Sequence, residues 1–140
     1  MKNIYEVFDD FELAKNKQDK MKVIEKNLTQ VLVDVLKYTY DPRYEWYFTE
    51  VPDNYKIAQI PAGMGYAKIT TELRKIYMFQ KGHPTADALT QKRRVELLLQ
   101  ILENLEPREA EVIIGIFNKD QGVKGLDAKF VKEAFPNLIP

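Results

Sequence analysis

The sequence contains no cysteine and a single histidine, His83. The absence of cysteine excludes disulfides, thiolate metal sites and cysteine nucleophiles, and it is compatible with a reducing compartment. A single histidine cannot supply the paired ligands of common zinc motifs. Because His83 lies in a loop before a proline, we interpret it as a surface or capping residue and expect no metal site.

Motifs that handle nucleotides are also missing. No GxxxxGK[ST] phosphate loop occurs, and the "GMG" at residues 63–65 lacks the third glycine and the preceding strand of a dinucleotide fingerprint. Carboxylate pairs such as Asp9 with Asp10 fall on expected solvent-facing helix surfaces, where nothing separates their pKa values. The sequence therefore predicts no catalytic residue in this chain.

Long apolar runs and an excess of one charge are absent as well. No run approaches the roughly 18 apolar residues of a membrane span, and acidic residues interrupt the stretch that a signal peptide would need. We expect a soluble, cytoplasmic protein. Lysine and arginine total 21 and aspartate and glutamate total 21, so the formal net charge is zero. Any binding of anions must come from local placement of charge.

Helical periodicity is the main positive signal. With 140 residues and 45% hydrophobic content, the chain fits one domain, residues 1–140, with one buried core. Apolar residues recur at the i, i+3, i+4 and i+7 positions that mark one face of a helix. The pattern predicts a monomeric, compact all-α domain of six to eight helices, with long helices near residues 28–40, 69–80, 95–105 and 110–117 and shorter ones near 4–14, 17–27 and 126–135.

The aromatic-rich stretch over residues 41–66 breaks this periodicity. Three prolines interrupt it, and we predict an irregular connection with one short helix near residues 44–48. In such a helix Trp46 and Phe48 would lie about 200° apart, so they could not both face one groove. We interpret the aromatic cluster mainly as core; the alternative is a stacking platform for single-stranded bases.

Two stretches place closely spaced glycines and a lysine before a helical stripe: "IPAGMGYAKITTELRKI" and "KDQGVKGLDAKFVKEAF". Glycine permits close backbone approach, and free N–H groups at a helix start attract anions. The pattern is typical of helix-hairpin-helix-like phosphate clamps, and ordinary helix connections explain it equally well. The candidate DNA-binding residues are Gly63, Gly65, Lys68 and Arg74 in the first stretch, and Lys119, Gly122, Lys124, Gly125, Lys129 and Lys132 in the second.

Two segments resemble the N-terminal DNA-binding domain of T-even-type phage ATP-dependent DNA ligases. "KMKVIEKNLTQVLVDVLKYTYDP" is similar to a family stretch in which K-x-x-x-[IL]-E-K-N leads into a helix, and "GLDAKFVKEAFPNLIP" is similar to the segment that ends in L-I-P before the catalytic domain. The resemblance implies an all-helical domain that grips phosphates along the minor-groove side of nicked duplex DNA. It also implies that the chain stops where the nucleotidyltransferase domain would begin.

The chain departs from this family at two places, position 133 and the region around Asp120, where it carries about one extra residue. Glu133 stands where the family has a lysine, so Lys129 or Lys132 would have to take over that phosphate contact. The K-x-D-G motif of the adenylated lysine is absent, and "KDQG" at residues 119–122 has the wrong order. ATP and Mg²⁺ would therefore belong to a separate catalytic domain, and we expect no cofactor in this chain.

Three functions follow from these observations. The leading hypothesis is a non-catalytic domain of an ATP-dependent ligase that binds duplex DNA, preferentially nicked, without reading its sequence, with the catalytic domain as its partner in a full-length enzyme. The second is a helical protein-interaction or scaffold domain. The third is a free-standing phage protein, in the bacterial host cytoplasm, that occupies DNA nicks or ends without sealing them.

Overall fold

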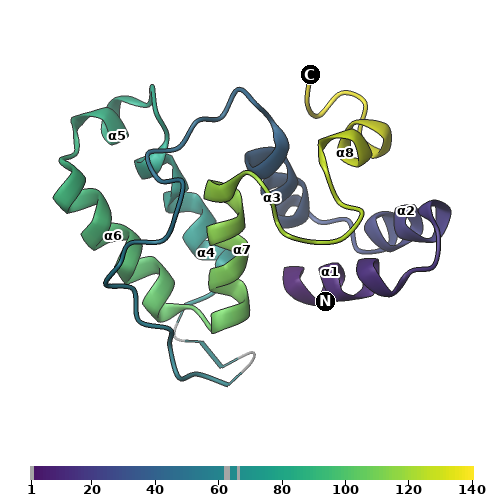
Figure 1. Ribbon diagram of the computed structural model, residues 1–140, viewed down its shortest axis with the longest axis horizontal. Coiled ribbons are helices and arrows are strands. Elements are labelled where there is room, and N and C mark those ends of the chain that lie inside the picture. The colour runs from purple at the N-terminus through teal and green to yellow at the C-terminus, as the bar shows by residue number, and fades with distance from the viewer. Residues whose placement is uncertain (1, 62–63, 66) are drawn as a thin grey trace.

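Helices built on the apolar stripes make up the fold. The computed structural model describes residues 2–61, 64–65 and 67–140, and this part of the chain is all-α, with eight α-helices, one 3₁₀ helix (η1) and no strand beyond one isolated bridge (Figure 1). None of the described helices is both long and apolar enough to cross a membrane. The elements are α1 (Ile4–Leu13), α2 (Lys17–Lys26), α3 (Gln30–Tyr40), α4 (Ile69–Glu72), η1 (Leu73–Phe79), α5 (Pro84–Ala88), α6 (Gln91–Asn104), α7 (Pro107–Asn118) and α8 (Ala128–Ala134).

Capping residues set where several helices begin. Thr29 and Thr90 each accept a hydrogen bond from a backbone N–H in the first turn of α3 and α6, at 3.2 and 3.1 Å. The second cap makes α6 start four residues before its predicted apolar stripe. Helix α5 was not predicted, because five residues are too few to show a period. His83 caps it by accepting from the N–H of Thr85 at 3.2 Å, which confirms the capping interpretation.

The predicted helix over residues 69–80 divides in two. Only Ile69–Glu72 forms an α-helix, and Leu73–Phe79 winds as the tighter 3₁₀ helix. The apolar side chains still face the core, since Leu73, Ile76 and Phe79 are all buried.

The core lies where α1, α3 and α7 meet. Helix α3 packs against α7 and α8, and α1 packs against α2 and α7. Side chains from these helices, such as Phe11, Leu32, Leu36 and Ile116, are fully buried. In Figure 1, α5 and α6 lie at one end of the molecule, whereas α1, α2 and α8 lie at the other, with α4 and α7 between them.

The prediction of a short helix near residues 44–48 is wrong. This segment is extended and pairs with the end of η1: the N–H of Tyr47 donates to the carbonyl of Phe79, and Trp46 forms an antiparallel bridge with Gln80. Alternate residues of an extended chain face the same side. Trp46 and Phe48 are consequently both buried, and both rings pack on Phe117, which confirms that the aromatic cluster belongs mainly to the core.

Candidate nucleic-acid interface

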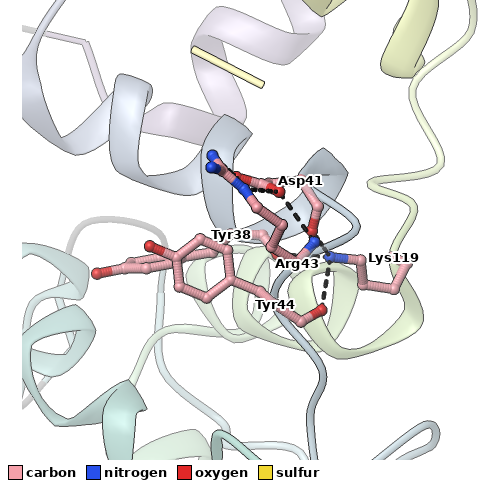
Figure 2. A network of polar contacts seen from close by, with 5 residues as sticks. All are labelled: Tyr38, Asp41, Arg43, Tyr44 and Lys119. Atoms are coloured by element: carbon pink, nitrogen blue, oxygen red, sulfur yellow. Dashed lines mark hydrogen bonds and ion pairs between the residues drawn. The ribbon is translucent and has the colours of Figure 1, made fainter. Parts of the chain in front are cut away.

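The second glycine turn starts at Lys119, which ends α7 in a left-handed conformation with φ 58°. Its Nζ donates to the carbonyl oxygens of Tyr38 at 3.2 Å, Asp41 at 2.7 Å and Tyr44 at 3.2 Å (Figure 2). Carbonyls at a helix end lack helical partners, so this ammonium group caps the end of α3. Burial lowers the pKa of Lys119, and Asp41 opposes that shift. The charge of Lys119 is therefore directed inward, toward backbone carbonyls, and not toward a DNA phosphate as the sequence suggested.

The side chain of Asp41 also helps to fix the Lys119 end of the turn. Its carboxylate is buried and accepts from Arg43 Nη2 at 2.7 Å and Nε at 3.0 Å (Figure 2). These bonds hold the pKa of Asp41 below its usual value. The carboxylate stays ionised, so the Lys119 end of the turn is fixed by a compact set of charges.

Tyr40 and Gln121 hold the middle and the far end of the turn. The Tyr40 hydroxyl donates to the carbonyl of Leu126 and accepts from the N–H of Gln121, both at 3.2 Å. Burial raises the pKa of Tyr40 to about 12, which keeps the hydroxyl protonated as a donor. The Gln121 side chain donates to Thr39 and to the carbonyl of Val112 at 3.0 and 2.9 Å. The turn is therefore held rigidly against α3 and α7.

Gly122 and Gly125 both need glycine because their φ angles are 69° and 87°, but their surroundings differ in charge. Gly122 borders a cavity lined by the carboxylates of Asp9, Glu12 and Glu111 and by Arg108. Gly125 borders a cavity of about 420 Å³ lined by four lysines and two carboxylates: Lys15, Lys17, Lys20, Lys129, Asp127 and Glu133. Electrostatics therefore favour anion binding on the Gly125 side.

Carboxylates already occupy several backbone amides of this turn. The N–H of Gly122 donates to Asp120 at 2.8 Å, and the N–H of Lys124 donates to Glu12 at 3.2 Å. Asp127 likewise caps α8 by accepting from the N–H of Phe130 at 2.8 Å. The groups left to meet a phosphate are chiefly lysine side chains rather than backbone amides.

Three exposed lysines lie in the second glycine turn and on α8, which follows it. Lys124, Lys129 and Lys132 have no ion-pair partner among residues 2–61, 64–65 and 67–140. Lys129 and Lys132 are three residues apart on α8, so they project from neighbouring positions on one helix face. Among the candidates of the second stretch, Lys129 lines one cavity with Gly125 and another with Lys132, whereas Gly122 borders the acidic cavity.

The first glycine turn is built differently. A Cβ on Gly65 would lie 2.8 Å from the backbone nitrogen of Glu106, so this glycine is needed for close packing on the α6–α7 connection. The N–H of Ala67 donates to the carbonyl of Asn104 at 2.9 Å and fixes that contact. The other predicted glycine, Gly63, lies outside the described residues.

Lys68 and Arg74 are exposed beside this turn, and a carboxylate lies near the first of them. Lys68 lines a cavity together with Glu109 at the start of α7, and its charge acts to lower the pKa of that carboxyl. The cavity also includes Asn3 and Ile4, at the start of α1, whereas the second turn contacts Phe11 and Glu12 near its end. The ten-residue α1, about 15 Å long, therefore separates Lys68 from the second turn.

Helix α6 carries three consecutive basic residues, Lys92, Arg93 and Arg94, which are only partly exposed. Arg94 is buried, donates to the carbonyl of Ala86 at 2.9 Å, and stacks over Tyr47 with its guanidinium carbon 3.6 Å from the ring centroid. Lys92 and Arg93 remain exposed. Sequence reasoning missed the lysines of the α1–α2 region, Lys15, Lys17 and Lys20, although their density in "KNKQDK" was a signal that could have found them.

Comparison with known proteins places the chain in a family. Residues 7–123 match a family of unknown function (DUF6433). The chain belongs to this family. The matched region ends at Val123, so Lys124, Gly125 and α8 lie beyond it. No curated protein matches the sequence.

Among solved structures, the fold is similar to part of a DNA ligase, Pmar-Lig_PreS3, with a TM-score of 0.70 and 16% sequence identity. The match covers 100% of this chain and 32% of that chain, so this chain spans about a third of the ligase's length. At this identity the likeness concerns the fold. Within the described residues, no group of three or more histidine, aspartate or glutamate side chains is placed to hold a metal ion.

Proposed function

We propose that this chain is a non-catalytic domain that binds duplex DNA, preferentially at nicks, by contacting backbone phosphates without reading bases. One observation carries the proposal: Lys124, Lys129 and Lys132 lie exposed and without ion-pair partners among the described residues, on and directly after a turn that buried hydrogen bonds hold in place. Lysines in this state can meet phosphates without first breaking another ion pair.

The fold supports the same proposal. A likeness to part of a DNA ligase over the entire chain is what a ligase's DNA-binding domain would give. In that role the domain would act beside a catalytic domain and hold the duplex while the nick is sealed elsewhere. Lys68 would add a weaker contact, because α1 separates it from the second turn and Glu109 offsets its charge, and Arg74 on η1 would add another.

Charge reversal of two lysines tests this proposal. Lys124→Glu with Lys129→Glu should weaken binding to duplexes of unrelated sequence by the same factor, because phosphate contacts carry no sequence information. The slope of log K against log salt should fall in magnitude by about 2, since each lost phosphate contact changes it by about 0.9. Fluorescence anisotropy at several salt concentrations measures both quantities.

Lys92→Glu with Arg93→Glu supplies a control, in which Arg93 differs from Lys124 and Lys129 by its ion pair with Glu96. Lys92 and Arg93 are exposed, the change in charge is identical, and α6 lies at the opposite end of the molecule from α8 (Figure 1). The control should change the salt slope much less. Equal losses in the two double variants, or a loss confined to certain sequences, would contradict a phosphate interface at the second turn.

A further inference from the structure

The cavity beside Gly125 brings lysines from three separate parts of the chain to one place. Lys15 comes from the α1–α2 connection, Lys17 and Lys20 from α2, and Lys129 from α8. Asp127 and Glu133 are the acidic residues that line it, so the lining carries a net charge of +2 (four lysines minus two carboxylates). The lysines of the α1–α2 region have no role in the function proposed above.

The charged side chains that line the cavity differ in the interactions that they already make. Lys17 forms an ion pair with Glu133. Lys20 donates to the carbonyl of Phe11 at 2.7 Å and lies 4.7 Å from the centre of its ring, so its ammonium group is part of the packing. Asp127 is engaged as the cap of α8.

Two of the four lysines that line the cavity therefore remain available to a ligand. Among the residues that the structure describes, Lys15 and Lys129 have neither an ion pair nor a side-chain hydrogen bond, and both are exposed. They line the cavity from two different elements, Lys15 from the α1–α2 connection and Lys129 from α8. Unpaired lysines that converge on a hollow supply the charge that a phosphate group needs.

We propose that this cavity binds a phosphate group of DNA, with Lys15 and Lys129 as its cations and with Glu133 as an internal competitor that the phosphate displaces from Lys17. The hollow is open to solvent and its volume is about 420 Å³, so a phosphate can enter with part of its hydration shell. Once Glu133 has moved aside, Lys17 becomes a third cation for the same group.

Glu133 makes the proposal specific, because its removal should strengthen binding. A carboxylate beside the phosphate repels it and holds Lys17 away from it, so both effects lower the affinity. Glu133→Gln keeps the shape of the side chain and removes its charge. The variant should bind a nicked duplex severalfold more tightly than the parent protein, with a steeper salt dependence.

Lys15→Gln tests the opposite direction. It should weaken binding severalfold and reduce the magnitude of the salt slope by about 0.9, the value of one phosphate contact. Lys22→Gln is the matched control, because Lys22 is exposed on α2 and does not line the cavity. Thermal unfolding of each variant verifies that the fold is intact, which is expected for exposed residues.

The result is read by fluorescence anisotropy against a nicked duplex. Equal behaviour of Lys15→Gln and Lys22→Gln, or weaker binding by Glu133→Gln, would overturn the proposal. The inference rests on the proposed function. Lys124→Glu distinguishes a failure of the cavity assignment from a failure of the proposed DNA binding. If Lys124→Glu weakens binding while Lys15→Gln does not, the cavity assignment alone is wrong; if the parent protein binds no duplex at low salt, both are wrong.

Two DNA groups offer the same chemistry: a backbone phosphodiester and a terminal phosphate at the nick. Two nicked duplexes, one carrying a 5′-phosphate and one a 5′-hydroxyl, distinguish them. An equal penalty from Lys15→Gln on both duplexes assigns the cavity to a backbone phosphodiester, whereas a penalty only on the phosphorylated duplex assigns it to the terminal group.

Discussion

The two glycine turns of this protein perform different structural tasks. Around Gly65 the backbone packs directly on the α6–α7 connection, where a Cβ would lie 2.8 Å from a backbone nitrogen. Around Gly122 and Gly125 both glycines have positive φ, and a Cβ on Gly122 would meet nothing within 4 Å. The first turn uses glycine for close internal packing, whereas the second uses it to bend an exposed chain.

This difference shows that glycine near lysine before an apolar stripe does not by itself identify a phosphate clamp. What separates the turns is how their cations are grouped. None of Lys68, Lys124 and Lys129 forms an ion pair within the described residues, but Lys129 lines a cavity with three further lysines, whereas Lys68 shares its cavity with Lys2 and the buried Glu109. The grouping of cations in space is the better guide to a binding surface.

Gly65→Ala should have the largest effect on stability, through the packing of the first turn. The added methyl group meets backbone atoms that cannot rotate away, so we expect a loss of about 3 kcal/mol in the free energy of unfolding, at the upper end for overpacking. Urea denaturation monitored by circular dichroism measures it. A loss below that of Gly122→Ala would contradict the packing role.

Lys119→Met tests the anchor of the second turn. It removes a charged donor to three backbone carbonyls and should cost about 2 kcal/mol in the free energy of unfolding. Because the ammonium group is directed inward, the folded variant should keep nearly all of its affinity for duplex DNA. A stable variant with weakened DNA binding would show instead that Lys119 contacts phosphate.

Gly122→Ala should have a smaller effect, about 1 kcal/mol, since an alanine at positive φ is strained although space is open. The same denaturation experiment as for Gly65→Ala gives the value. Gly65→Ala and Gly122→Ala make the same chemical change, so the difference between their losses in free energy of unfolding reports directly on how the two turns differ. A reversed order would mean that backbone strain, and not packing, dominates at both.

Glu109→Gln has the smallest expected effect and probes the carboxylate near Lys68. Burial, with a contribution from Glu106, raises the pKa of Glu109, so the folded state favours its protonated form. The stability linked to this group is present at low pH and is lost as pH rises through the range above about 4.5. Glutamine is neutral throughout, so the variant should be slightly more stable at pH 7, and the gain should vanish below about pH 4. Urea unfolding at both pH values measures the gain, and destabilisation at pH 7 would contradict the effect of burial.

Periodicity in the sequence was enough to predict the all-α class and three of the four long helices, because each of these helices buries one regular stripe; the stripe over residues 69–80 instead forms the short α4 and the 3₁₀ helix η1. Periodicity also missed α5, which is too short, and wrongly predicted a helix at residues 44–48, where pairing with Gln80 and Phe79 decides the conformation. Similarly, no local pattern reveals that Lys119 turns inward to α3, since its three acceptors lie 75 to 81 residues earlier. Contacts distant in sequence determined the last two of these outcomes.

DNA binding by this domain is tested first by a salt titration of the protein on a nicked duplex and on its intact counterpart, followed by fluorescence anisotropy. We expect binding at low salt that weakens steeply as salt increases, and tighter binding to the nicked duplex. Absence of binding to either duplex at low salt would contradict the proposed DNA binding and would favour a protein-interaction domain.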